Sequence, residues 1–242
     1  MKKPFRWLRR IVILSLCLLC ACWVFEEAFQ WRFRWQAERL LADLKTIQVG
    51  HSSTEAESVL RKWAKRGDLD TRCGGDNGTS CYSIVRIRHL LPEALRGSPD
   101  GKAKNWLPQT LDCAGLRDSM VGAGVNTEHG VIVERWYAEE VQLPVREWYL
   151  RGGAYVPSLL VSAAEDDRFR SAHALGNINP SHQFRKAWRF KGPYGLLVSF
   201  TTQEAQSERD RLMDFRFSCI TQFFPCSNER EILPEGALLL DE

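Results

Sequence analysis

Histidines are the first residues to examine for catalysis or metal binding, because imidazole titrates near neutral pH and is the commonest metal ligand. Those of this chain are scattered, with no pair at metal-binding spacing: His51, His89, His129, His173 and His182. The first stands just ahead of a predicted helix, and the next two stand in or beside predicted strands. We therefore expect no catalytic histidine and no metal site.

Other chemically active residues also lack the context that catalysis requires. The acidic run at 165–167 either binds a cation or lies solvated in a loop. Gly122 and Gly124 lack the third glycine and the preceding strand of a dinucleotide-binding loop. Ser119 and Ser158 stand in no nucleophile motif, and the chain has no P-loop or kinase motif. We expect no cofactor, and the balance of the sequence is against an enzyme.

Five cysteines lie beyond the apolar N-terminal run, and disulfides are allowed if this part of the chain is outside the cytoplasm. Two pairs each bracket a short loop, and we interpret them as candidate disulfides, although other pairings stay open: Cys73 with Cys81, and Cys219 with Cys226. Cys113 is the odd residue, either a buried small side chain, an intermolecular bridge or a reactive free thiol.

The strongest signal is the uncharged run at 11–25, which follows five basic residues and ends at Glu26. Basic residues before an apolar span favour a cytoplasmic N-terminus, with the rest of the chain outside. The residues expected to face lipid are Ile11, Leu14, Leu16, Leu18, Leu19, Val24 and Phe25. The lipid bilayer is therefore the first expected partner.

Three fates of this segment remain open. An uncleaved single-pass anchor is favoured, because no cleavage motif of small residues follows the run. A lipoprotein is the second, because 19–22 is similar to a bacterial lipobox in which Cys22 would be lipidated. A cleaved signal peptide is the third.

The net charge of +3 belongs to this segment. Beyond Glu27 the chain carries equal numbers of basic and acidic residues, so no bulk positive field points to a nucleic-acid partner.

Residues 28–67 have a helical pattern. Phe29, Trp31, Phe33 and Trp35 either form a collar at the membrane surface or pack on the domain. Val49-Gly50 breaks the helix, and capping residues from Ser52 onward predict a second helix at 53–66.

From about residue 72 the pattern is typical of strands, predicted at 81–91, 131–138, 155–161, 184–190, 196–201 and 213–219. The 155–161 segment is placed at a sheet edge because of Pro157. Segments 184–190 and 196–201 are predicted to pair as a hairpin. Residues 92–128 and 164–183 are interpreted as irregular.

The predicted fold class is α+β: an N-terminal membrane helix, two short helices, then a mainly antiparallel β domain, sandwich-like or meander. We expect a membrane anchor or signal segment at 1–27, a helical juxtamembrane region at 28–67 and an exported β-rich globular domain at 68–242.

Residues 44–60, with a glycine followed by a capped helix, resemble the start of small outer-membrane assembly lipoproteins. More broadly, the basic-apolar start, this capped helix, 215–221, Cys226 and 230–234 resemble uncharacterised single-pass envelope proteins of the acidobacterial kind. That resemblance implies an envelope location and no activity.

The leading hypothesis is a membrane-anchored protein with an exported interaction or scaffold domain that binds an envelope protein partner. The alternatives are an exported enzyme, a hydrolase or one that uses the Cys113 thiol, and a membrane-proximal lipid-binding module built on 29–35.

Overall fold

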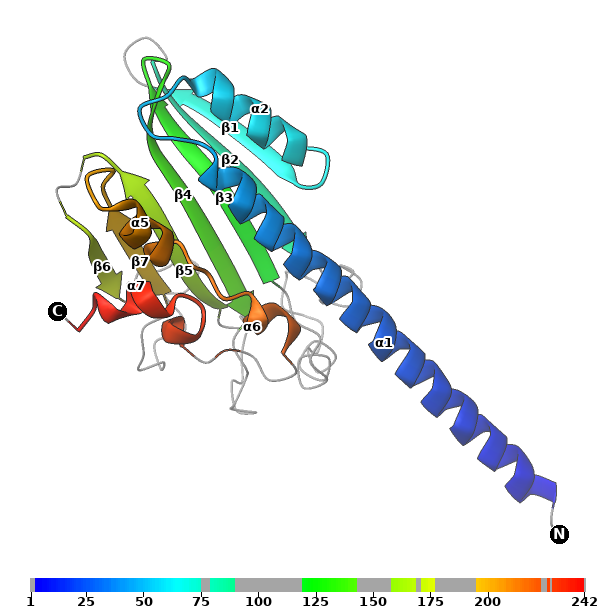
Figure 1. The fold of residues 1–242 in the computed structure, drawn as a ribbon. Helices are drawn as coiled ribbons and strands as arrows, with labels where there is room; N and C mark the ends of the chain where they lie inside the picture. The colour runs from blue at the N-terminus through cyan, green and yellow to red at the C-terminus, as the bar shows by residue number, and fades with distance from the viewer. Residues whose placement is uncertain are drawn as a thin grey trace, which may run out of the picture.

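The structure is a computed structural model that describes residues 3–74, 79–89, 119–142, 158–168, 171–176, 195–222, 226 and 228–241. Its first element is α1 (Lys3–Lys45), a helix of 43 residues. At 1.5 Å per residue this helix is about 65 Å long. Its N-terminal half projects away from the rest of the molecule, and its C-terminal half lies across the sheet (Figure 1). The predicted membrane helix and the predicted juxtamembrane helix are therefore one element.

The turn after α1 leads into α2 (Ser53–Trp63). Gly50 adopts a φ of +89°, a left-handed conformation that glycine reaches without steric cost. Ser52 caps the helix, its hydroxyl accepting a hydrogen bond from the backbone N–H of Thr54. The predicted break and the predicted cap are confirmed, and the helix ends three residues earlier than expected.

A seven-stranded sheet follows, in the spatial order β1-β2-β3-β4-β5-β7-β6. All neighbours are antiparallel except β5 and β7. The first five strands form a meander, which confirms the α+β class. The strands are β1 (Asp68–Gly74), β2 (Ser80–His89), β3 (Ser119–Glu128), β4 (Val131–Gln142), β5 (Ser158–Asp166), β6 (His173–Gly176) and β7 (Gly195–Phe200).

The helices cover one face of this sheet (Figure 1), and the hydrophobic core lies between the two layers. The C-terminal helices are α5 (Gln206–Leu212), α6 (Ser218–Thr221) and α7 (Pro234–Leu238), with a short 3-10 turn, η2 (Glu229–Glu231). The largest fully buried side chains come from both layers, among them Trp63 of α2 and Tyr137 of β4.

Strand β3 lies within the segment interpreted as irregular, so that part of the prediction is wrong. The indole of Trp136 on β4 covers Gly122 and Gly124, and a Cβ at Gly124 would lie 2.6 Å from the ring. Tyr82 of β2 stacks beside the same indole, with ring centroids 6.0 Å apart. The glycines that weakened the strand pattern are therefore the residues that make room for Trp136.

The predicted strand at 213–219 is also wrong. Met213, Phe215, Phe217 and Cys219 are buried as the alternation suggested, but they belong to a loop and to the start of α6. Rings from this loop pack against Tyr137, with centroids 4.9 Å and 6.0 Å away. Alternate burial along this loop therefore has the same two-residue period as a strand.

Three smaller corrections concern β4, β5 and β7. A register irregularity opposite Asn126/Thr127 places Ile132 and Arg135 on the buried face together, where strict alternation separates them. Strand β5 lies inside the sheet between β4 and β7, not at its edge. Strand β7 pairs with β5 and β6, and its predicted hairpin partner at 184–190 lies outside the described residues.

Candidate functional site

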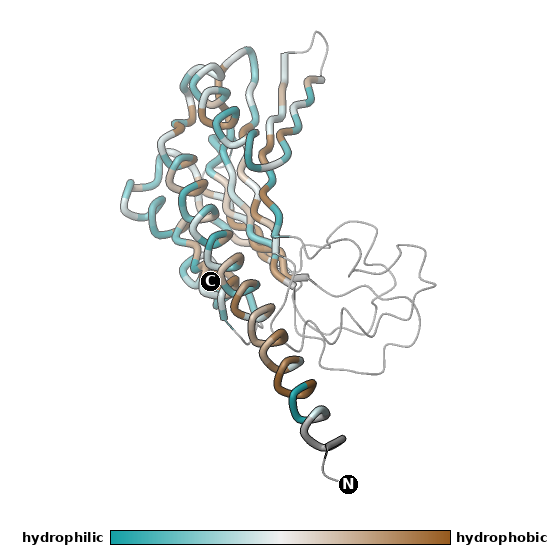
Figure 2. Tube along the Cα trace, turned by 90° about the vertical axis from the view of Figure 1, so that its right-hand side faces the viewer, coloured by the Kyte–Doolittle hydropathy of each residue, from teal (hydrophilic) through white to brown (hydrophobic). Residues whose placement is uncertain are grey.

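The N-terminal half of α1 is long and apolar enough to cross a membrane, with a mean hydropathy of 2.1 in its most apolar window. None of that window is buried against the rest of the molecule. Figure 2 shows the hydrophobic stretch continuing directly into the part of α1 that lies on the domain. The seven residues expected to face lipid are all exposed: Ile11, Leu14, Leu16, Leu18, Leu19, Val24 and Phe25. Cys22 is exposed on the same helix.

The aromatic residues at 29–35 were expected either to form a collar at the membrane surface or to pack on the domain, and they differ in their burial. Phe33 is 3% exposed and packs into the core, 5.7 Å from the ring of His89. Phe29, Trp31 and Trp35 are 43%, 57% and 45% exposed. One aromatic residue therefore belongs to the domain, and the other three lie on its surface.

Arg135 on β4 binds the C-terminal end of α1. Its Nη1 donates to the carbonyl oxygens of Leu44, Lys45 and Ile47, at 3.2, 2.9 and 2.5 Å. A cation at this end satisfies carbonyls that have no partner within the helix and opposes the negative end of the helix dipole. The same guanidinium pairs with Glu165 of β5 at 2.6 Å and is only 5% exposed. The C-terminal end of α1 is thereby fixed to the centre of the sheet.

This pairing settles the role of the acidic run at 165–167 within the structure. Glu165 also accepts from Arg209 at 2.7 Å, Asp166 pairs with Arg168 at 2.6 Å, and Asp167 accepts from the hydroxyl of Thr202. Each carboxylate has a protein partner, so the run binds cationic and hydroxyl side chains of the chain itself. Across the described residues, no three metal-ligating side chains gather into a cluster.

Glu139 on β4 is the most unusual ionisable residue of the core face. It is 0% exposed, and neither carboxylate oxygen has a hydrogen-bond partner among the described residues. Burial raises the pKa of Glu139 to about 8, although the charge of Arg34 on α1 lowers it. The side chain therefore keeps its proton at neutral pH.

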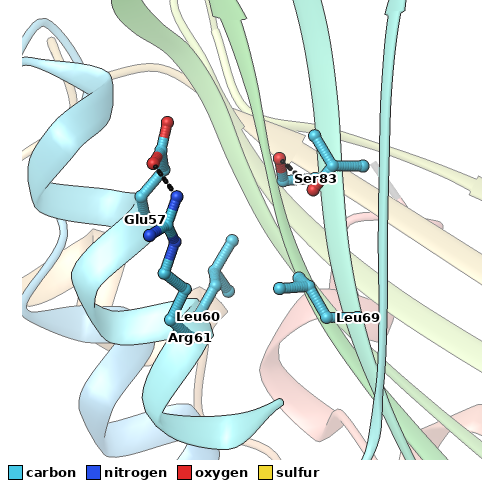
Figure 3. A pocket seen from close by; sticks show the side chains of 6 residues that line it. Glu57, Leu60, Arg61, Leu69 and Ser83 are labelled. Carbon is cyan, nitrogen blue, oxygen red and sulfur yellow. Dashed lines mark hydrogen bonds and ion pairs between the residues drawn. The ribbon is translucent and has the colours of Figure 1, made fainter.

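A groove runs between α2 and the edge of the sheet. It has two connected parts, of about 320 Å³ and about 230 Å³. Leu60 of α2 and Leu69 of β1 face each other across it (Figure 3). Its rim is polar: Glu57 pairs with Arg61 on one side, and hydroxyls of neighbouring strands pair on the other. The groove therefore has an apolar floor and no concentration of like charge.

Strand β1 is a free edge beside this groove. Within the described part of the chain it pairs with β2 alone, and six of its seven residues are exposed. An exposed edge presents a row of backbone donors and acceptors to which another extended chain can add. The Cys73–Cys81 disulfide ties this edge to β2.

Four of the five cysteines beyond the apolar span lie in the part of the chain that the structure describes. Cys73 is bonded to Cys81, and Cys219 is bonded to Cys226. Cys113 and His182 lie outside the described residues, as do positions 92–118 of the segment interpreted as irregular. His129 occupies a tight turn between β3 and β4, with a φ of +52°, and His51 pairs with Glu55 at 3.0 Å.

Sequence reasoning missed Arg135, which binds the end of α1, and Glu139, whose carboxyl is buried on the core face of the sheet. Both stand in ordinary strand alternation, and only the position of α1 reveals their burial. Comparisons of the chain with family models, with curated proteins and with solved structures found no match.

Proposed function

We propose that this protein is a membrane-anchored interaction domain, with its N-terminus in the cytoplasm and its sheet outside. The observation that carries the proposal is that α1 continues without a break from the apolar span to the core of the domain. Because Arg135 binds the end of the same helix, the domain has a fixed orientation relative to the bilayer. A continuous helix that is fixed to the sheet suits a surface that binds a partner at a defined distance from the membrane.

The partner surface is the β1 edge together with the groove beside it. From Phe29 to Lys45 the helix rises about 24 Å, which places the groove about that far above the membrane surface. An extended segment of an envelope protein is the occupant that fits. Its backbone pairs with β1, and an apolar side chain enters between Leu60 and Leu69.

The membrane arrangement is tested with a reporter fused after Glu242. We expect activity outside the cytoplasm, and activity only inside would overturn the proposed orientation. Mass spectrometry of the mature chain then distinguishes the uncleaved anchor from lipidation at Cys22.

The partner surface is tested by photo-crosslinking in intact membranes, with a photoreactive amino acid at Thr71 in the groove. A matched probe at Leu175 on β6, the opposite edge strand, is the control because this residue is also exposed. We expect a discrete adduct from Thr71 that is lost in a Leu69→Arg variant and absent from the Leu175 probe. Equal labelling from both edges would contradict the proposal.

A further inference from the structure

The face of the sheet opposite the helices carries a flat aromatic surface. Trp136 of β4 alternates with the buried residues Arg135 and Tyr137, so its side chain lies on this face. A Cβ at Gly124 would lie 2.6–2.8 Å from three atoms of the indole, and one at Gly122 would lie 3.4 Å from a fourth. The indole therefore lies flat on β3, with its other side turned outward.

Tyr82 of β2 extends this surface. Its ring lies within 10° of parallel to the indole of Trp136, with the two centroids 6.0 Å apart. Parallel rings at that separation are displaced sideways and overlap little, so Tyr82 leaves most of the outer side of the indole uncovered. Both side chains are partly exposed. We call these two rings the platform.

A row of polar side chains borders the platform. Cross-strand pairing aligns four residues from β2 to β5: Tyr82, Asn126, Glu134 and Asp166. Glu134 accepts hydrogen bonds from the amide of Asn126 and from Arg168, which also pairs with Asp166 at 2.6 Å. The side chain of Arg168 is 57% exposed, and its Nη1 has no partner within the described part of the chain. The row therefore holds planar donor and acceptor groups beside the platform.

The chemistry of a sugar ring matches this arrangement. A pyranose has an apolar face of C–H groups that packs on an aromatic ring, and a rim of hydroxyls that donate and accept hydrogen bonds. An acetamido substituent adds an N–H donor, which suits the carboxylate of Glu134, and a C=O acceptor, which suits the guanidinium of Arg168. A flat polysaccharide chain covers two neighbouring rings with successive sugars.

The platform lies well away from the apolar span. His89 at the end of β2 contacts Glu26, which closes that span, with Nε2 and Oε1 3.3 Å apart. Strand β2 runs from this contact away from the span (Figure 1). Tyr82 precedes His89 by seven residues, so it lies about 23 Å along the strand from the contact. A polysaccharide outside the bilayer therefore has access to the platform.

We propose that the platform and its polar row bind a polysaccharide chain whose sugars carry acetamido groups. Trp136 and Tyr82 pack against the faces of successive sugars, and Glu134 and Arg168 bind the acetamido group. The choice of a polysaccharide rests on the proposed location of the sheet outside the cytoplasm. The site is separate from the groove beside β1, so the two partners occupy different surfaces of the domain.

The test is isothermal titration calorimetry of the full chain with chitohexaose, a linear chain of N-acetylglucosamine. The detergent must lack a sugar headgroup, because such a headgroup would compete for the platform. We expect a dissociation constant below about 1 mM. Cellohexaose, which has the same backbone without acetamido groups, should bind more weakly, and equal affinity for the two sugars would overturn the proposed selectivity.

Two variants remove the rings one at a time. Trp136→Leu and Tyr82→Leu should each weaken the binding of chitohexaose about three- to tenfold, because each removes one aromatic contact. The matched control is Trp31→Leu, which removes a 57% exposed tryptophan from α1 and should leave the affinity unchanged. Arg168→Gln should reduce the preference for chitohexaose over cellohexaose while both rings stay in place. Circular dichroism should show every variant folded.

Absence of chitohexaose binding, or an equal loss in Trp31→Leu, would overturn the sugar site. A proline-rich peptide also packs on flat aromatic rings, and displacement of the sugar by a tighter-binding peptide of this kind would assign the platform to a protein and overturn the proposal. These results do not depend on the orientation of α1, which the reporter fused after Glu242 tests separately.

Discussion

The buried carboxyl of Glu139 makes the stability of the domain depend on pH. Burial raises its pKa in the folded chain to about 8, against 4.5 for an exposed glutamate. Folding therefore takes up a proton between these two values. This contribution to stability is fully present below pH 4.5 and is lost as the pH rises. The loss is complete above about pH 8, where Glu139 is ionised in both the folded and the unfolded chain. One pKa unit corresponds to about 1.4 kcal/mol, so the full loss is about 5 kcal/mol.

The perturbation is Glu139→Gln, which preserves the shape of the side chain and removes its titration. We measure the unfolding free energy of the variant minus that of the wild type. From pH 5 to pH 8 this difference should increase by about 4 kcal/mol, because only the wild type loses stability through Glu139. The assay is guanidinium unfolding of the full chain in detergent micelles, followed by tryptophan fluorescence at several pH values. Comparing the two chains cancels the titration of the groups they share.

The control is Glu140→Gln, which removes the same charge from the next residue, on the opposite face of β4. Parallel stability curves for Glu139→Gln and the wild type would refute the reasoning. They would show that Glu139 gains a partner or water that the described residues do not supply. If the pH dependence of the unfolding free energy disappears in both variants, the effect comes from charge near β4 in general and not from burial of Glu139.

Three further predictions follow from the packing. Arg135→Met should lower the unfolding free energy by about 3–5 kcal/mol, since it removes a donor from two carbonyls at the end of α1, from the carbonyl of Ile47 in the next turn and from a buried carboxylate. An unchanged midpoint of unfolding in guanidinium chloride would contradict this role. Gly124→Ala should cost about 1–3 kcal/mol because its Cβ meets the Trp136 ring, and adding Trp136→Leu should recover most of that loss in a double-mutant cycle. Removing the Cys73–Cys81 bridge with two serines should cost about 2–3 kcal/mol under oxidising conditions, and thermal unfolding without reductant should reveal the difference.

The fold could be predicted wherever the local pattern and the tertiary environment agree. The basic-apolar start, the Gly50 break and the Ser52 cap are local signals, and each has its expected structure. Strand β3 could not be predicted, because its glycines make sense only beneath the Trp136 ring from the next strand. The 213–219 segment was wrongly predicted as a strand, because its residues are buried alternately although the segment pairs with no strand among the described residues.

The candidate site was harder to predict than the fold. Exposed Trp31 and Trp35 could be distinguished from buried Phe33 only once the side of α1 that meets the sheet was known. The role of Arg135 depends on contacts with residues 88–91 positions earlier. The role of Glu139 depends on burial by distant elements, and no local pattern records either.

The contact between Arg135 and the end of α1 also bears on the order in which the protein is assembled. The carbonyls that Arg135 binds precede it by 88–91 residues, so α1 is synthesised and can enter the membrane well before its partner strand exists. During that interval the apolar side of the helix, with Leu40 and Leu44, has no sheet to cover it. If α1 is anchored as proposed, the domain is completed on a helix already held at the membrane, and this apolar face stays uncovered until β4 has emerged.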